Sequence, residues 1–193
     1  MKDGTSQFGH EEDFKPFVLW FTGLSASGKT TLAQLLQAEL TRSGFRCFVL
    51  DGDLLRGGLC NDLGFSSLDR AENVRRAGEV ARLLVDAGLV VLAAFISPYV
   101  ADRARVRSRF AQDQFYEVYL ECPIEVCRQR DPKGLYRKAQ EGLIPKFTGI
   151  SDPYEPPPAP DLVVRTGELT VQQSLQALYQ FCLDRGLAHE GSQ

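Results

Sequence analysis

Residues 17–30 read FVLWFTGLSASGKT, and this stretch decides the fold. Its first half is a continuous apolar run, which is typical of a parallel strand buried on both faces. Its second half fits the spacing G-x-x-x-x-G-K-[ST] in full, and a helical pattern follows it. In such a loop, backbone N–H groups turn inward toward phosphate oxygens, and the helix N-terminus adds partial positive charge. We therefore predict a phosphate-binding loop between the first strand and the first helix.

The loop also predicts which residues bind ATP and Mg²⁺. Lys29 supplies a point charge for the β- and γ-phosphates, and Thr30 supplies a hydroxyl for Mg²⁺. The spacing is not the G-x-G-x-x-G of dinucleotide-binding domains, and the N-K-x-D string of GTPases is absent. The loop alone does not separate ATPases from small-molecule kinases, but a long irregular segment near 131–160 suits a kinase with a mobile lid. The predicted ATP-binding residues in the loop are Gly23, Leu24, Ser25, Ala26, Ser27, Gly28, Lys29, Thr30 and Thr31.

Strand-like apolar runs alternate with helical patterns along the rest of the chain. The runs cover residues 17–21, 47–50, 89–96, 115–120 and 162–164. Helical patterns cover about 28–43, 69–87, 99–113 and 170–186, and another begins at Pro123. This order predicts an α/β fold, a P-loop NTPase-type parallel β-sheet with helices on both faces. The periodicity fails over about 131–160, which is rich in proline near its end, and we expect a lid segment there.

Length and composition predict one domain. The chain has 193 residues and a formal charge of −3. We expect a kinase domain over 16–186 between polar tails at 1–15 and 187–193. The slightly acidic balance argues against a nucleic-acid partner. No apolar run reaches the roughly 18 residues that a membrane span requires.

The cysteines and histidines narrow the chemistry. Five cysteines, an odd number with no Cys-x-x-Cys pair, predict reduced thiols in a cytoplasmic protein. The two histidines, His10 and His189, lie in the polar tails. A catalytic base within the domain is therefore expected to be a carboxylate.

Two carboxylates follow the second strand and are the candidates for that role. We predict that Asp53 is the base and that Asp51 lies nearer the metal, because the third strand ends without an acidic residue. The alternative is a turn that uses Asp and Gly for its geometry. Downstream, Arg70 and Asn73 open a helix at the expected ligand end. The arginine row 103–109 alternates around its helix, and we expect it to be mostly solvated surface.

Several strings, in this order, resemble the adenylyl-sulfate kinase family, also called APS kinases. They are GLSASGKT (23–30), DGDLLR (51–56), DLGFS (62–66), DRAENVRR (69–76), ISPY (96–99), RDPKGLYRKA (130–139) and FTGISDPYEPP (147–157). The similarity runs from about 17 to 186. Two positions depart from the family pattern: Ala26 stands where glycine is common, and Val100 where arginine is frequent.

The resemblance implies transfer of the ATP γ-phosphoryl group to the 3′-hydroxyl of adenosine 5′-phosphosulfate (APS), giving PAPS in sulfate assimilation. It implies that Phe65 stacks on the acceptor's adenine, although an isolated Phe would more often be a core residue. It also marks Ser97 as a phosphoserine intermediate, for which direct in-line transfer is the alternative. Arg130 would lie near the ATP adenine. The implied acceptor-binding residues are Asp53, Arg56, Phe65, Arg70, Asn73, Ile96 and Ser97, with Lys133, Gly134, Leu135 and Phe147 from the lid.

The resemblance further implies a homodimer and a functional or fused ATP sulfurylase as partner. Two other functions stay open at this point. One is a P-loop kinase acting on a nucleoside, a sugar or a small acid. The other is a regulatory domain that binds nucleotide without catalysis, against which the complete loop and both Asp51 and Asp53 speak.

Overall fold

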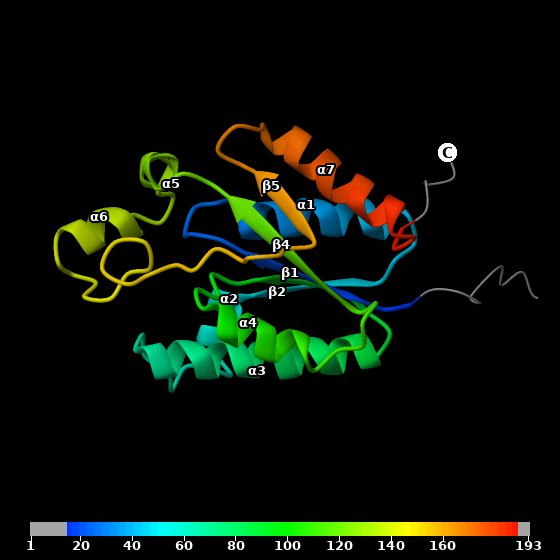
Figure 1. Ribbon diagram of the computed structural model, residues 1–193, viewed down its shortest axis with the longest axis horizontal. Helices are drawn as coiled ribbons and strands as arrows, with labels where there is room; N and C mark the ends of the chain where they lie inside the picture. Colours follow the sequence, from blue (N-terminus) through cyan, green and yellow to red (C-terminus); the bar gives the residue numbers. More distant parts are fainter. Residues whose placement is uncertain (1–14, 189–193) are drawn as a thin grey trace, which may run out of the picture.

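The apolar run before the phosphate loop forms the central strand of a five-stranded parallel sheet (Figure 1). The computed structural model describes residues 15–188. The sheet has the order β2-β3-β1-β4-β5. Its strands are β1 (Val18–Thr22), β2 (Cys47–Asp51), β3 (Val90–Ala94), β4 (Phe115–Glu121) and β5 (Leu162–Arg165). The predicted α/β class and parallel pairing are confirmed.

Helices cover both faces of the sheet, and β1 shows why. Phe17, Leu19 and Phe21 pack with residues of α1 (Lys29–Arg42) and α7 (Val171–Asp184). The alternate residues of the strand, Val18 and Trp20, pack with residues of α3 (Ser67–Asp86) and α4 (Val100–Arg107). All five residues are fully buried, because successive side chains of a strand point to opposite faces and both faces are covered.

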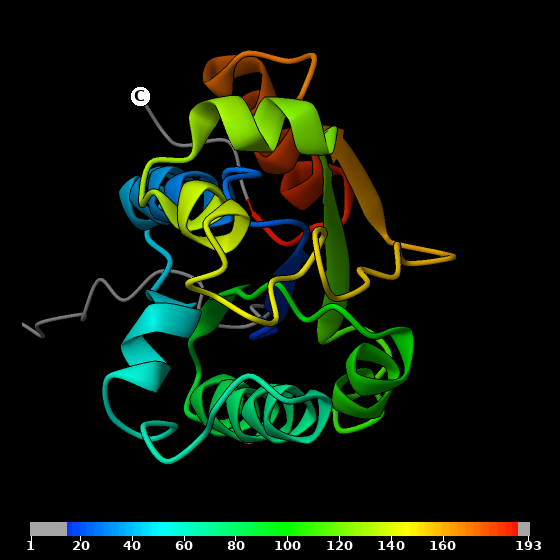
Figure 2. The same ribbon diagram turned by 90° about the vertical axis from the view of Figure 1, so that its left-hand side faces the viewer.

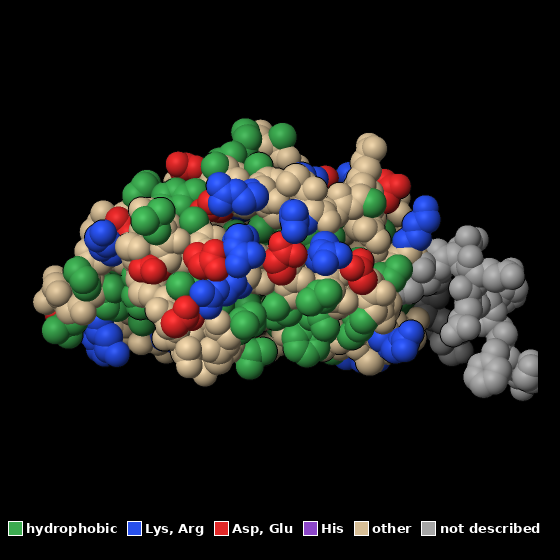
Figure 3. Space-filling view, turned by 90° about the horizontal axis from the view of Figure 1, so that it is seen from below, with side chains coloured by type: hydrophobic (Ala, Val, Ile, Leu, Met, Phe, Trp, Pro, Cys, Tyr) green, Lys and Arg blue, Asp and Glu red, His purple; other side chains and the backbone are tan. Residues whose placement is uncertain are grey.

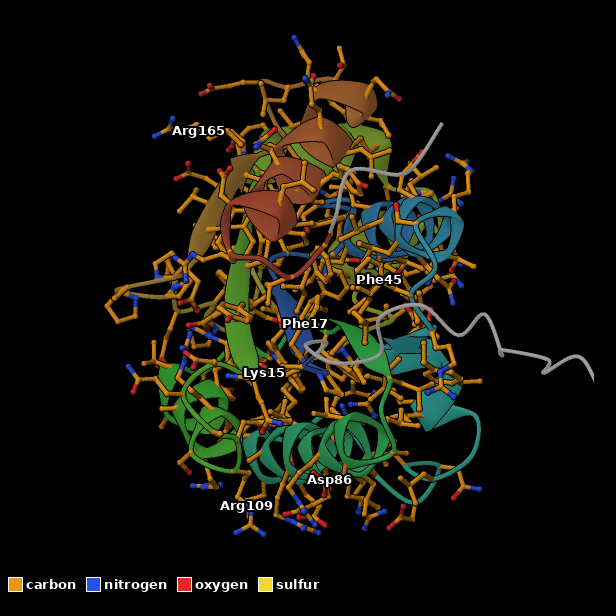
Figure 4. All side chains as sticks on the ribbon, turned by 90° about the vertical axis from the view of Figure 1, so that its right-hand side faces the viewer. Lys15, Phe17, Phe45, Asp86, Arg109 and Arg165 are labelled. Carbon is orange, nitrogen blue, oxygen red and sulfur yellow. The ribbon has the colours of Figure 1, made fainter. Side chains whose placement is uncertain are left out.

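Three short helices lie at the edge where the strands end (Figure 2). They are α2 (Gly52–Arg56), α5 (Ile124–Arg130) and α6 (Leu135–Gln140). Helix α6 corrects the expectation that 131–160 is irregular throughout. It has six residues, too few for a helical period to stand out in the sequence. The opposite edge, where Lys15 and Phe17 lie, is shown in Figure 4.

The outer face of α3 and α4 carries both signs of charge (Figure 3). Exposed ion pairs join Arg75 to Glu72 and Arg109 to Glu79. The expectation of a solvated arginine row is correct for Arg105 and Arg109, but Arg103 is 2% exposed. The reason is tertiary, since Arg103 points inward to Glu117 of β4.

Other expectations concern the thiols and the tails. All five cysteines are free thiols. Among residues 15–188, no helix is both long and apolar enough to cross a bilayer. The histidines His10 and His189 and most of both predicted tails lie outside the described residues.

Candidate functional site

The loop after β1 takes a backbone path that its glycines permit. A Cβ on Gly23 would lie 2.7 Å from the Leu120 carbonyl oxygen, so only glycine fits there. Gly28, with φ of 99°, caps the N-terminus of α1. Ala26 has φ of 61°, a left-handed conformation that costs an L-residue about 1–2 kcal/mol. The departure from glycine at position 26 thus places strain in the loop.

Lys29 lies within this loop and is 9% exposed. Its Nζ donates to the Gly23 carbonyl (3.0 Å), to the Leu24 carbonyl (2.7 Å) and to Ser27 Oγ (3.4 Å). Burial lowers the pKa of the Lys29 ammonium to about 8. The loop therefore holds a cation whose charge responds to its surroundings near neutral pH.

Thr30 and Asp51 bring two hard oxygen ligands together. Thr30 Oγ1 donates to Asp51 Oδ2 at 2.6 Å, while the other Asp51 oxygen accepts from the Asp53 N–H at 2.8 Å and caps α2. Hydroxyl and carboxylate oxygens suit Mg²⁺, which usually keeps several waters and binds one or two protein groups plus phosphates. Within 15–188 no three acidic, His or Cys side chains gather into a metal cage. The pair therefore fits a phosphate-bound Mg²⁺ better than a cage-bound ion.

Asp53 stands at the start of α2 with its carboxylate exposed. The side chain forms an ion pair with Lys133, which comes from the segment between α5 and α6. Hydrogen bonding to Asp53 raises the pKa of Lys133. The sequence separates these two residues by 80 positions, and the fold brings the predicted base and a predicted lid residue into contact.

The carboxyl edge encloses a cavity of about 840 Å³ that joins the loop to these carboxylates. Arg130 lines this cavity and donates to the Thr166 carbonyl at 2.5 Å. Sequence reasoning missed Thr148, Thr166, Leu169, Val171 and Ser174, which also line it. For the last four, the signal available was the end of β5, since parallel strands end at one edge of a sheet. Thr148 lies in the FTGISDPYEPP string (147–157).

Most of the predicted site residues line this one cavity. They are Ser25, Ala26, Ser27, Gly28, Lys29, Thr30, Thr31, Asp51, Asp53, Arg56, Phe65, Arg70, Asn73, Ile96, Ser97, Arg130, Lys133, Leu135 and Phe147. The other three predicted site residues act through their backbone atoms. Gly23 and Leu24 accept hydrogen bonds from Lys29, and Gly134 caps the N-terminus of α6.

The cavity wall near α3 combines an aromatic ring with polar groups. The Phe65 side chain is exposed, not in the core, and the Arg56 guanidinium lies 4.4 Å from its ring centroid. Asn73 is 7% exposed, and its Oδ1 has no hydrogen-bond partner among the described residues. A flat ring beside a buried, free acceptor suits a planar base that carries an N–H donor.

Arg70 ties the 146–152 segment to α3. Its guanidinium donates to the Lys146 carbonyl (2.7 Å) and to Thr148 Oγ1 (3.0 Å), and it pairs with Asp152 at 3.5 Å. Its Nε donates to the Phe65 carbonyl at 3.1 Å. Arg70 therefore holds the 146–152 segment and the Phe65 loop in addition to facing the cavity.

The predicted lid is also joined to the phosphate loop through α6. Tyr136 of α6 donates from its hydroxyl to the Ser25 carbonyl at 3.1 Å. Its ring meets Phe147 edge to face, with centroids 4.9 Å apart. These two rings form a small apolar cluster with Cys122 and Cys127, against which the loop residue Leu24 packs.

Ser97, after β3, is buried with φ of 40°. Its hydroxyl accepts from Trp20 Nε1 (3.1 Å) and donates to Thr22 Oγ1 (3.1 Å). Thr22 in turn donates to the Ile96 carbonyl at 2.8 Å and accepts from the Tyr154 hydroxyl at 3.0 Å. The Ser97 proton is thus committed to a structural hydrogen bond.

Known proteins share this arrangement. An adenylyl-sulfate kinase of Geotalea daltonii is 56% identical over 179 residues, covering 93% of this chain and 86% of that protein. A solved structure of the Mycobacterium tuberculosis APS kinase with AMPPNP and APS has a TM-score of 0.84 and 44% identity, covering 89% of this chain and 99% of that one.

A solved structure of a gluconokinase from Sinorhizobium meliloti has a TM-score of 0.54 and 16% identity, covering 90% of this chain and 97% of that one. At this identity the likeness shows only that the fold is shared. The model of the adenylylsulphate kinase family matches residues 15–165. The chain therefore belongs to the adenylylsulphate kinase family, and its activity is the ATP-dependent phosphorylation of adenylyl sulfate.

Proposed function

We propose that this kinase transfers the γ-phosphoryl group of ATP directly to the 3′-hydroxyl of APS, with Asp53 as the base. The observation that carries this proposal is the single cavity in which the Lys29 loop, the Thr30–Asp51 pair and Asp53 face one another. Phosphoryl transfer needs positioning and charge neutralisation more than covalent chemistry, and this cavity supplies both.

The phosphate loop neutralises the transferring group. The N–H donors of Lys29 are directed at loop oxygens at 2.7–3.4 Å, and phosphate oxygens entering the loop would replace them as acceptors. A polyphosphate also favours the charged form of an ammonium whose pKa burial has lowered. Lys29 would therefore stabilise negative charge on the β- and γ-phosphates.

Thr30 and Asp51 would hold Mg²⁺, with Asp51 acting through water. When bound, the ion would neutralise phosphate charge during transfer. Asp51 also caps α2 and so fixes the start of the helix that carries Asp53. One residue thus positions both the metal side and the base.

Asp53 would accept the proton of the 3′-hydroxyl. Its carboxylate is exposed to the cavity and forms an ion pair with Lys133. Lys133 belongs to the predicted lid, 131–160. We propose that this segment closes over the acceptor and excludes water, which would otherwise compete for the phosphoryl group.

The acceptor would lie against the α3 wall. Phe65 would stack on its adenine, with Arg56 behind the ring and the free Oδ1 of Asn73 accepting from a base N–H. Arg70, Ile96, Ser97, Gly134, Leu135 and Phe147 would complete that side, and Arg130 would lie by the adenine of ATP.

Direct transfer leaves Ser97 without a covalent role. A nucleophilic serine needs a base to take its proton, whereas this hydroxyl donates to Thr22. We propose that Ser97 holds the loop after β3 in place.

An assay of the purified chain with Mg-ATP and APS, following PAPS, tests the function. Coupled ADP release with AMP, adenosine and gluconate in place of APS is the control for other P-loop kinases. PAPS formation that exceeds turnover of every control supports the proposal. Binding of ATP and APS without PAPS formation would instead support a non-catalytic regulatory domain.

Three further features are proposed from the family resemblance. They are a homodimer, a functional or fused ATP sulfurylase as partner, and a cytoplasmic location. Light scattering of the purified chain at several concentrations tests the dimer, because a monomer mass throughout would contradict it.

A further inference from the structure

Arg103 is the most buried charged side chain among residues 15–188. Its Nε donates to Glu117 Oε1 at 2.6 Å, so its charge is paired inside the protein. Burying a charge is costly unless it is both paired and fully hydrogen-bonded. The contacts of the other two guanidinium nitrogens therefore indicate the role of this buried arginine.

These two nitrogens join two segments that are distant in sequence. One donates to the Ser97 carbonyl at 2.6 Å and the other to the Glu155 carbonyl at 2.8 Å. Ser97 belongs to the loop after β3 that lines the cavity, and residues 154–155 lie on the lid arm, the last part of the predicted lid, which leads to β5. The guanidinium also lies 5.9 Å from the Tyr154 ring centroid.

Further hydrogen bonds close the same junction. The Glu155 N–H donates to the Pro98 carbonyl at 2.8 Å, and the Glu155 carboxylate accepts from the Val100 N–H at 2.7 Å, at the start of α4. Tyr154 donates to Thr22, the partner of Ser97. The arm and the loop are thus joined at several points, with Arg103 at the buried centre.

The junction has a functional consequence because Ser97 is strained. A non-glycine residue at φ of 40° persists only where its surroundings hold it. Arg103 holds its carbonyl, while Trp20 and Thr22 hold its hydroxyl. Loss of the Arg103 contact would let the loop relax away from the cavity.

We propose that Arg103 is a positioning residue for the acceptor half of the site. It fixes the Ile96–Ser97 loop against the lid arm, so both stand in one arrangement when the acceptor nucleotide binds. The proposal rests on the proposed function, in which this half binds APS. The ATP half, built on the loop after β1, does not touch the guanidinium and is expected to be independent of it.

The test compares Arg103→Lys with Arg109→Lys. Lysine at 103 keeps a charge for Glu117 but lacks the planar fork that reaches both carbonyls. We expect the KM for APS to rise about tenfold or more, with little change in the KM for ATP. Arg109, whose ion pair with Glu79 is exposed on the same helix, should tolerate lysine without effect on either constant.

The single tryptophan provides a readout besides activity. Trp20 donates to Ser97 Oγ, so its fluorescence should report on the loop. In the wild type, APS should change this signal, and in Arg103→Lys the change should need a correspondingly higher APS concentration. PAPS formation by the wild type tests the proposed function. The ratio of the KM for APS in Arg103→Lys to that in the wild type tests the positioning role of Arg103.

Equal changes in the KM for ATP and for APS, or a lowered melting temperature with unchanged constants, would overturn the proposal. If Arg103→Lys does not fold, Glu155→Ala decides, because it removes the bond to the Val100 N–H and leaves the guanidinium in place. In Glu155→Ala we expect a smaller rise in the KM for APS, with the KM for ATP unchanged. Equal changes in the two KM values would again overturn the proposal.

Discussion

The phosphate loop and the proposed acceptor side of the cavity are built in different ways. The phosphate loop is local, since residues 23–30 follow one strand, open one helix and bind one another. The proposed acceptor side draws Asp53 from α2, Arg70 and Asn73 from α3, Ser97 from the loop after β3, and Lys133 from the segment between α5 and α6. A local loop can be recognised as a motif, whereas the acceptor side depends on many tertiary contacts.

This difference predicts how each half responds to change. Substitutions in the loop should weaken the stabilisation of negative charge on the ATP phosphates and leave acceptor binding intact. Substitutions on the acceptor side should affect the position of the acceptor and its proton.

Asp53→Asn should lower kcat by about 10²–10⁴-fold with ATP affinity unchanged, because an amide cannot accept the hydroxyl proton. Steady-state kinetics and ATP titration measure this. Lys133→Met is the matched control, since it breaks the same ion pair but keeps the carboxylate. A loss in Lys133→Met as large as that in Asp53→Asn would assign the effect to the ion pair and not to a base.

Lys29→Met should lower kcat by about 10²–10³-fold, the usual consequence of removing one group that stabilises transition-state charge. The Kd for APS, measured without ATP, should not change, because Lys29 belongs to the loop. Weakened APS binding in this variant would show that the two halves are not separable.

ATP binding should take up protons above neutral pH. The pKa of Lys29 is lowered to about 8, so about half of the side chains are neutral at pH 8, and bound phosphate favours the charged form. Calorimetry in buffers of different ionisation enthalpy should give an uptake of about half a proton at pH 8 and none near pH 6. The uptake should vanish in Lys29→Met, and its persistence there would point to another group.

Ser97→Ala separates a positioning role from a covalent one. Loss of the bonds to Trp20 and Thr22 should raise the KM for APS severalfold while kcat stays within about tenfold of wild type. If a folded Ser97→Ala variant has no turnover, that result would support a phosphoserine intermediate. Thr22→Ser, which retains the hydroxyl partner, should behave like the wild type.

Ala26→Gly should stabilise the fold by about 1 kcal/mol or less, because glycine adopts a left-handed φ without the strain that alanine carries. Thermal unfolding would show a rise of a few degrees in Tm. Ala38→Gly in the exposed face of α1 should do the opposite, since glycine costs about 1 kcal/mol in a helix interior. A fall in Tm for Ala26→Gly would show that the methyl packing outweighs the strain.

Sequence reasoning recovered the sheet, the covering helices and the loop, because each carries a periodic or spaced signal. The spacing of the loop and the ends of the strands indicated the loop residues, Asp51 and Asp53, whereas the family resemblance indicated most of the other predicted cavity residues, such as Phe65 and Lys133. Sequence reasoning missed α6, which is too short for a period, and the lining residues after β5, which form no motif. It placed Arg103 on the surface, because helical spacing does not reveal an inward-facing acid on a distant strand.

The sequence by itself determined the strand order along the chain, the phosphate loop and the absence of histidine from residues 11–188, which moved the proton chemistry to a carboxylate. These follow from residue type and spacing, which are local properties. Tertiary packing was needed to pair Lys133 with Asp53, to bond the Ser97 hydroxyl to Thr22, and to join the loop after β3 to Glu155 through Arg103. Such contacts link residues dozens of positions apart, and only packing against the shared sheet brings them within hydrogen-bonding distance.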